Sequence, residues 1–298
     1  MSTFSIVILN YNTCDLTTKC IESFRRNNKG NDKLNFVIVD NCSTDKSGFE
    51  LKNIYENDVE VSVIINNENL GFSKGNNIGL EYALNNFRSD FIVFSNSDVI
   101  INENNFFEKV NNIYLDSGFA ILGPDVYNPL TKYHQSPLIR KPKLDQYFIK
   151  KRKINLSIKK IILYFQFVIP ILKRVSNRIK KQRSVPIFIN EVVTDCVIHG
   201  SFLIFSKQFL NEYPMGFYNE VFMYGEEEIL YCMAIQRGLK IVYDPTIQVL
   251  HYEEQSTNKT FPDDKVKGLF KINNMMESTK ILDKIIADQI FKEHITNG

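Results

Sequence analysis

The residues of this chain that are best suited to chemistry lie in two short polar clusters. The first, Ser95–Asp98, directly follows the apolar run Phe91–Phe94. Its carboxylate, amide and hydroxyl oxygens are ligands that Mg²⁺ and Mn²⁺ prefer to sulfur or to a site made of imidazoles alone. We therefore treat Asp98 as a candidate metal ligand. The same four residues are also typical of a turn that caps a following helix, and the residue types alone do not separate the two interpretations.

The second cluster consists of three consecutive glutamates, Glu226, Glu227 and Glu228, between Gly225 and an apolar helical pattern that ends at Gly238. A helix N-terminus stabilises a negative charge by about 0.3 to 1 kcal/mol, whereas mutual repulsion and burial oppose ionisation. At least one of the three is expected to be ionised at neutral pH, where it could take a proton from an attacking hydroxyl. Their enrichment could also reflect the helix dipole alone.

Alternating strands and helices over the first hundred residues position the first cluster. Short buried strands followed by amphipathic helices predict an α/β fold with a mostly parallel sheet and right-handed crossovers. Because ligands of such sheets bind beyond the carboxyl ends of the strands, Asp40 and Asp98 are expected to face one crevice. The predicted strands are Ser5–Asn10, Asn35–Asp40, Val61–Ile65 and Phe91–Phe94, and the predicted helices are Asp15–Asn27, Gly48–Tyr55 and Asn77–Asn85.

A glycine-rich segment, NLGFSKGNNIGL, leads into the last of these helices. Gly71, Gly75 and Gly79 are expected to let the backbone turn tightly there. Asn76 and Asn77 could supply amide donors and acceptors at the mouth of the crevice. The segment matches neither a Walker loop nor a G-x-G-x-x-G motif, so an ordinary strand-to-helix loop is the alternative.

The second half of the chain contains shorter and more widely spaced strand patterns. Asp244 and Pro245 are predicted to form a turn between two of them, and Gly123-Pro124 is predicted to end another. A long helical pattern at the C-terminus favours packing or homo-oligomerisation over chemistry. The predicted strands are Ala120–Leu122, Val192–Val197, Lys240–Tyr243 and Gln248–His251, and the predicted helices are Glu103–Leu115 and Asp263–Phe291.

The region Lys141–Arg183 is strongly basic and contains one acid, Asp145. Between its basic flanks lies the apolar run Ile161–Leu172, which is far shorter than the ~20 residues that a membrane-spanning helix needs. The run could lie in the interface of an anionic membrane, or pack as an amphipathic helical hairpin over the rest of the chain. Its aromatic residues are grouped rather than interleaved with basic ones, so nucleic acid is not an expected partner.

The bulk composition predicts a globular protein of a reducing compartment. The chain has 298 residues, of which 44% are hydrophobic, enough for a sizeable core. Its five cysteines are odd in number and never spaced as C-x-x-C, which argues against a disulfide framework or a zinc knuckle. The N-terminus passes into a strand pattern without the features of a signal peptide. We expect a cytoplasmic protein, either free or attached peripherally to the inner face of the cell membrane.

Four segments in order, SIVILNYN, FVIVDNCSTD, NENLGFSKGNNIGL and FSNSDV, resemble the N-terminal half of family-2 glycosyltransferases. The resemblance is to the bacterial rhamnosyltransferase-like branch and covers roughly residues 3–128 and 192–256. It implies the GT-A fold, a Rossmann-like, mostly parallel sheet flanked by helices. The implied parts are a nucleotide-sugar-binding half (1–128), a basic amphipathic helical insertion (129–191), an acceptor and catalytic half (192–256) and a C-terminal helical segment (257–298).

The same resemblance implies roles for single residues. In the family, the acid after the second strand contacts the nucleoside, which implies that role for Asp40, and the Asx-Asp segment after the fourth strand binds metal and diphosphate, which implies that role for Asp98. A histidine after the base-bearing helix commonly ligates the metal, and His251 matches it. Mn²⁺ or Mg²⁺ is the implied cofactor. The residues assigned to the nucleotide, from the resemblance and from their position at the crevice, are Asn10, Asn12, Asp40, Asn41, Gly71, Lys74, Asn76, Asn96 and Ser97.

The family's base is the second acid of a Glu-Asp pair in a segment like YGED. This implies Glu227 as the base and Glu226 as a hydrogen-bonding partner of the acceptor. The chain departs from the family pattern because Glu stands in place of that Asp, and because Ile229 stands where relatives often have another Asp. The choice among the three glutamates therefore stays open.

The metal site also departs from the family's Asp-x-Asp, since this chain has Asn96-Ser97-Asp98 there. With a single carboxylate, the site is expected to hold a bare cation weakly and to bind it together with the donor's diphosphate.

The resemblance as a whole implies an inverting glycosyltransferase. It would move a sugar from a UDP- or dTDP-sugar to a hydroxyl of a saccharide or polyprenyl-linked acceptor, in the synthesis of a bacterial surface polysaccharide such as a capsule. Two alternatives remain at this point. One is a sugar-phosphate nucleotidyltransferase, although LNYNT lacks the basic glycine-rich loop expected after its first strand. The other is a sugar-nucleotide-binding or scaffolding protein without catalysis.

Overall fold

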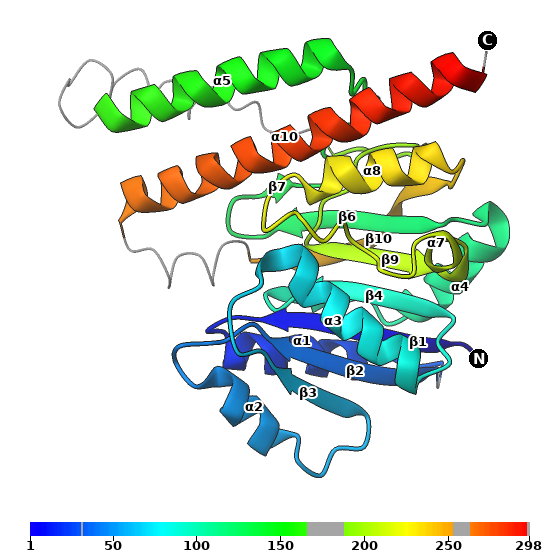
Figure 1. The fold of residues 1–298 in the computed structure, drawn as a ribbon. Coiled ribbons are helices and arrows are strands. Elements are labelled where there is room, and N and C mark those ends of the chain that lie inside the picture. The colour runs from blue at the N-terminus through cyan, green and yellow to red at the C-terminus, as the bar shows by residue number, and fades with distance from the viewer. Residues whose placement is uncertain (31, 166–187, 253–262, 297–298) are drawn as a thin grey trace.

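The computed structural model describes residues 1–30, 32–165, 188–252 and 263–296, which form one mixed β-sheet with helices on both faces (Figure 1). The strands follow the order β3-β2-β1-β4-β9-β6-β10-β5, with β7 beside β6 and β8 beside β10. The strands are β1 (Thr3–Asn10), β2 (Lys33–Asp40), β3 (Val61–Ile65), β4 (Phe91–Asn96), β5 (Val99–Ile101), β6 (Ile121–Asn128), β7 (Tyr133–His134), β8 (Val193–Thr194), β9 (Phe202–Ser206) and β10 (Ile241–His251).

The sheet joins two parallel parts through one antiparallel strand. β3, β2, β1 and β4 pair in parallel, as the βα pattern of the first hundred residues predicts. β6 and β10 also pair in parallel. β9 lies between β4 and β6 and is antiparallel to both, so it connects the two parts into a single sheet. The predicted α/β architecture is confirmed, and the carboxyl ends of β4 and β10 are brought within reach of each other.

Helices cover both faces of the sheet. The helices on one face are α1 (Cys14–Arg26), α2 (Ser47–Ile54) and α4 (Phe106–Ser117), and those on the other are α3 (Gly71–Asn86), α7 (Lys207–Glu212) and α8 (Glu226–Gln236). Two longer helices, α5 (Gln146–Phe165) and α10 (Asp264–Thr296), pack against each other and lie outside α8, with α5 outermost (Figure 1).

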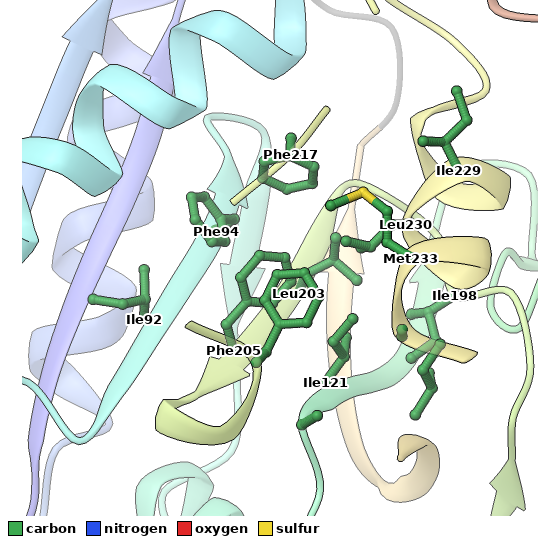
Figure 2. Packing of buried hydrophobic residues seen from close by; sticks show 14 of the residues in the cluster. Ile92, Phe94, Ile121, Ile198, Leu203, Phe205, Phe217, Ile229, Leu230 and Met233 are labelled. Carbon is green, nitrogen blue, oxygen red and sulfur yellow. The ribbon is translucent and has the colours of Figure 1, made fainter. Parts of the chain in front are cut away.

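Side-chain alternation along the strands separates the interior into two apolar cores. On β1, Ile6 and Ile8 pack in the core under α1, whereas Val7 packs in the core under α3. Figure 2 shows part of the second core, where apolar side chains of β4, β9 and α8 meet. In that core the ring centroids of Phe94 and Phe205 are 4.8 Å apart, and the two rings meet edge to face. These contacts of its buried face hold α8, the helix on which the three glutamates lie, in place against the sheet.

The glycine-rich segment is helical rather than a loop, because α3 begins at Gly71, six residues earlier than predicted. The prediction that all three glycines free the backbone for a tight turn is wrong for Gly75 and Gly79, which lie inside the helix. A Cβ atom on Gly75 would lie 2.6 Å from Leu9 Cδ1, and one on Gly79 would lie 2.4 Å from Val7 Cγ1. These glycines therefore let α3 approach β1 closely, which local sequence patterns do not reveal.

Two strand breaks predicted at prolines are absent. β6 continues through Gly123-Pro124, and β10 continues through Asp244 and Pro245, with a bulge before pairing resumes at Gln248. Proline removes one N–H donor from a ladder but has a φ that an extended strand accepts. Because β6 and β10 pair with each other both before and after these residues, the loss of one hydrogen bond does not end either strand.

Helices α5 and α10 lie within the predicted basic insertion and the predicted C-terminal segment, whose outer boundaries stay predictions. Of the apolar run Ile161–Leu172, the residues up to Phe165 form the end of α5, and the remainder lies outside the described residues. No helix in the part of the chain that the structure describes is both long and apolar enough to cross a membrane.

We predict that Gly79→Ala destabilises the protein by about 1 to 3 kcal/mol, because the added methyl group overlaps the stiff side chain of Val7 in β1 and outweighs the better helix propensity of alanine. Chemical denaturation measures the change. Gly30→Ala is the matched control, since the nearest atom to its new Cβ lies 3.4 Å away. Equal stability of the two variants would show that α3 moves away from β1 at little cost.

Candidate active site

A cavity of about 390 Å³ lies at the carboxyl ends of β1, β2, β4 and β10 and is bounded on its other side by α5, α8 and α10. This is the position at which α/β sheets usually bind ligands. The polar and charged residues that line it are Tyr11, Asn41, Asn69, Asn96, Ser97, Asp98, Arg152, His199, Ser201, Tyr224, Glu226, Glu227, Glu228, His251 and Lys271.

Asp98 and His251 lie side by side on the strand wall of the cavity, and both are largely buried. Asp98 Oδ1 is 3.3 Å from His251 Nε2. His251 Nδ1 is 2.7 Å from Gln135 Oε1, which can only accept, so Nδ1 donates this hydrogen bond. Nε2 then lies on the side of the Asp98 carboxylate. Two lone-pair donors in this arrangement suit a shared cation, with Gln135 orienting the imidazole from behind.

The three glutamates lie on the opposite wall, at the first turn of α8. Gly225 precedes them with φ of +93°, and a Cβ there would lie 2.6 Å from Ser278 Oγ of α10, so this helix start requires glycine. Glu227 Oε1 accepts a hydrogen bond from the backbone N–H of Gly200 at 3.4 Å. Glu228 forms an ion pair with Arg152 of α5. The three neighbours in sequence therefore have three different environments.

Burial and neighbouring charges raise the pKa values of Glu226 and Glu227, which line the cavity. Burial, with the added charge of Glu228, raises the pKa of Glu227 to about 7. Burial and the charge of Glu227 raise the pKa of Glu226 well above its ordinary value. One Glu226 oxygen, Oε2, is buried without a hydrogen-bond partner. Burial therefore raises the pKa of both glutamates and places that of Glu227 close to neutral pH.

Eight of the predicted site residues line the cavity, and five do not. Asn41, Gly71, Asn96, Ser97, Asp98, Glu226, Glu227 and His251 are on its wall, whereas the residues away from it are Asn10, Asn12, Asp40, Lys74 and Asn76.

Asp40 is buried and bonded inside the protein. Its Oδ1 accepts from Asn10 Nδ2 at 2.6 Å and from Ser43 Oγ at 2.5 Å, and its Oδ2 accepts from the Ser43 N–H at 3.0 Å. Asn10 Oδ1 in turn accepts from the hydroxyls of Thr13 and Thr17. These contacts join the ends of β1 and β2, so they account for both side chains without a ligand. A nucleoside contact of Asp40 stays a prediction.

The other residues away from the cavity also have structural partners or face solvent. Asn12 Oδ1 accepts from the Thr44 N–H at 2.8 Å, and Asn76 Nδ2 donates to the Phe72 carbonyl within α3 at 3.0 Å. Lys74 is exposed on α3. Their assignments to the nucleotide likewise stay predictions.

Sequence reasoning missed three side chains that shape the site, Arg152, Lys271 and Gln135. Arg152 and Lys271 come from α5 and α10 and line the cavity beside the glutamates. No local signal distinguishes Arg152 from the other basic residues of its region, because its inward direction depends on how α5 packs. Gln135 follows the short strand β7 and has no motif of its own.

One comparison with known proteins shows the family. Residues 5–177 match the sequence model of a family described as Glycosyl transferase family 2. Among curated proteins, the low-salt glycan biosynthesis hexosyltransferase Agl10 of Haloferax volcanii is 29% identical over 93 residues. That stretch covers 31% of this chain and 28% of Agl10, so it spans well under two thirds of the relative.

Solved structures match over more of the chain. S. aureus TarS 1–349 gives a TM-score of 0.53 at 14% identity and covers 99% of this chain and 74% of that one. Its complex with UDP-GlcNAc gives 0.52 at 14% identity, with 97% and 71% covered. GalNAc-T7 with UDP, GalNAc and Mn²⁺ gives 0.55 at 14% identity, with 84% and 44% covered. At this identity the likeness shows the fold, and it confirms the predicted GT-A arrangement.

We predict that Glu227→Gln raises the melting temperature relative to wild type, and that the gain is larger at pH 8 than at pH 5. The folded-state pKa of about 7 exceeds the ordinary 4.5, so the wild type loses stability as pH rises from about 4.5 to 7 and stays at the lower level above that. Thermal unfolding at both pH values measures the difference. The exposed Glu81→Gln is the control, and an equal pH response of the two variants would contradict the raised pKa.

Proposed function

The chain belongs to glycosyl transferase family 2, and from this premise we propose that it transfers a hexosyl or rhamnosyl group from a UDP- or dTDP-sugar, with inversion at the anomeric carbon. The acceptor would be a hydroxyl of a saccharide or polyprenyl-linked saccharide in surface polysaccharide synthesis. The observation that carries the proposal is that Asp98, His251 and Glu227 line one cavity of about 390 Å³. This volume is in the usual range for small-molecule sites.

Glu227 is the proposed base. Inversion requires that an acceptor hydroxyl attacks the anomeric carbon from the side opposite the diphosphate, and the hydroxyl must lose its proton as it does so. A new bond forms between the acceptor oxygen and the anomeric carbon, the bond to the diphosphate breaks, and the proton passes to Glu227. With its pKa near 7, Glu227 matches the pH range in which a base is most effective.

Glu226 is the proposed acceptor-binding residue. Burial and the charge of Glu227 raise its pKa and so favour the protonated form, which can donate a hydrogen bond to a sugar oxygen as a carboxylate cannot. Its side chain lines the cavity, and its Oε2 is buried without a hydrogen-bond partner among the described residues. The two buried carboxyl groups are thus proposed to act differently, Glu226 as a hydrogen-bond donor to the acceptor and Glu227 as the base.

Asp98 and His251 are the proposed ligands of Mn²⁺ or Mg²⁺. The two donors lie 3.3 Å apart, which fits a shared ion. Among the described residues no group of three or more acidic, histidine or cysteine side chains could hold an ion by itself, so donor phosphate oxygens would complete the site. When bound, the ion would offset the charge that develops on the leaving diphosphate.

The relatives support the donor and the ion by likeness. TarS has been solved with UDP-GlcNAc, GalNAc-T7 has been solved with UDP and Mn²⁺, and Agl10 is named as a hexosyltransferase of glycan biosynthesis. A nucleotide-sugar donor and a divalent ion are therefore the first ligands to test on this chain.

We predict that Glu227→Gln lowers the rate of sugar transfer by about 10²- to 10⁴-fold, the usual contribution of a positioned base, while donor binding is retained. The wild-type rate should rise with pH through about 7, where Glu227 loses its proton. Transfer of radiolabelled sugar measures the rate, and a thermal shift with the donor measures binding. Glu81→Gln, which removes an exposed acid of α3, should leave both unchanged.

Other outcomes would identify the alternatives. Undiminished transfer in Glu227→Gln would exclude Glu227 as the base. Donor binding by the wild type with neither transfer nor hydrolysis would indicate a binding protein, and release of pyrophosphate would indicate a nucleotidyltransferase.

We predict that Mn²⁺ and the donor stabilise the protein together far more than either does alone, because one carboxylate and one imidazole hold a bare ion weakly. Asp98→Asn should weaken donor binding in the presence of Mn²⁺ by at least about tenfold, a loss seen even for residues that only support a ligand. Calorimetry with and without chelator measures this loss. Asp116→Asn, on the exposed side of α4, is the control. Donor binding that Mn²⁺ does not change would refute this metal site.

A further inference from the structure

The inner face of helix α5 packs against the rest of the protein. Ile149 and Leu156 are buried there, 1% and 2% exposed. Between them Arg152 pairs with Glu228, and Lys153 Nζ lies 2.6 Å from Asp283 Oδ2 of α10. This face holds α5 against α8 and α10 and contributes Arg152 to the cavity wall.

The outer face of α5 carries an apolar stripe that nothing in the described structure covers. Its members follow one another at intervals of seven, four, three and four residues, which at about 3.6 residues per turn places them in one line opposite the inner face. Each of them is about half exposed or more, on the outermost element of the molecule (Figure 1). The stripe consists of Tyr147 (73% exposed), Ile154 (51%), Ile158 (49%), Ile161 (57%) and Phe165 (50%).

The charged side chains of α5 are all basic. The helix contains six basic residues and no acidic one. Arg152 and Lys153 point inward to acids, but Lys150 and Lys151 are exposed and flank the stripe between Tyr147 and Ile154. An apolar line with lysines on both sides is the pattern of helices that lie in the plane of a membrane interface.

We propose that the outer stripe of α5 docks on an anionic membrane surface. The apolar side chains enter the boundary between headgroups and acyl chains, and the lysines contact acidic headgroups. A second copy of the chain fits this face less well, because two α5 helices placed face to face bring their lysines together. The proposal moves the expected membrane contact from the run Ile161–Leu172 to a stripe that begins at Tyr147.

The docking would also position the active site. Arg152, on the inner face of the same helix, lines the cavity beside the glutamates, so docking through the outer face would bring the cavity near the membrane surface. Where the proposed transferase activity holds, the acceptor would be a polyprenyl-linked saccharide at the same surface. The docking itself depends only on α5 and is tested without donor or acceptor.

Vesicle flotation tests the proposal with the full chain. The wild type is expected to float with phosphatidylcholine vesicles that contain phosphatidylglycerol, less so as salt rises, and not with phosphatidylcholine alone. The triple variant Ile154→Glu, Ile158→Glu and Ile161→Glu should partition at least about a hundredfold less, since it places acids in the stripe. Replacing Lys150 and Lys151 by Gln should reduce partition roughly 25-fold, at about fivefold for each lysine.

A second triple variant is the matched control. Val59→Glu, Leu115→Glu and Leu130→Glu add the same charge at exposed apolar sites elsewhere and should float like the wild type. Circular dichroism and the donor-induced thermal shift show that each variant is folded, and they separate a failure of docking from a failure of donor binding. Flotation of the α5 triple variant like the wild type, or equal binding to neutral vesicles, would overturn the proposal. So would a wild-type dimer that this variant abolishes, which would identify a second copy as the occupant.

Discussion

The crowding of three carboxyl groups at one buried helix start is the constraint on which the site depends. Repulsion and burial make three ionised glutamates at positions 226, 227 and 228 unfavourable, and the fold relieves this in different ways. Glu228 pairs with Arg152, the pKa of Glu226 is raised, and Glu227 is left with a pKa of about 7. Three identical residues thus differ in their ion pairing and in their pKa because their surroundings differ.

The strands β9 and β5 bring the proposed base and the proposed metal ligands together. β9 pairs with β4 on one edge and β6 on the other, and β5, which begins directly after Asp98, pairs with the end of β10, where Val99 lies opposite His251. The turn before β9 supplies the Gly200 N–H that contacts Glu227. A pocket formed only by the ends of the first four strands would lack the part of its wall that α8 and the end of β10 supply.

Helix α5 contributes both to the candidate site and to the outer surface of the protein. Its inner face supplies Arg152, and its outer face carries an apolar line between lysines. Removal of α5 would expose Glu228 to water and leave it without its ion pair, so the helix belongs to the active site although it lies in a basic region of the sequence. One element can serve both purposes because opposite faces of a helix are independent surfaces.

The sequence by itself determined the alternating strands and helices of the first hundred residues, the GT-A resemblance and the two polar clusters, because periodicity, capping and short motifs are properties of neighbouring residues. Tertiary structure alone decided that Asp40 bonds to Asn10, that Gly75 and Gly79 let α3 pack closely on β1, and that Arg152 pairs with Glu228. Each of these depends on which strands pair and how closely helices pack. Such contacts join residues far apart in the chain, and no local pattern encodes them.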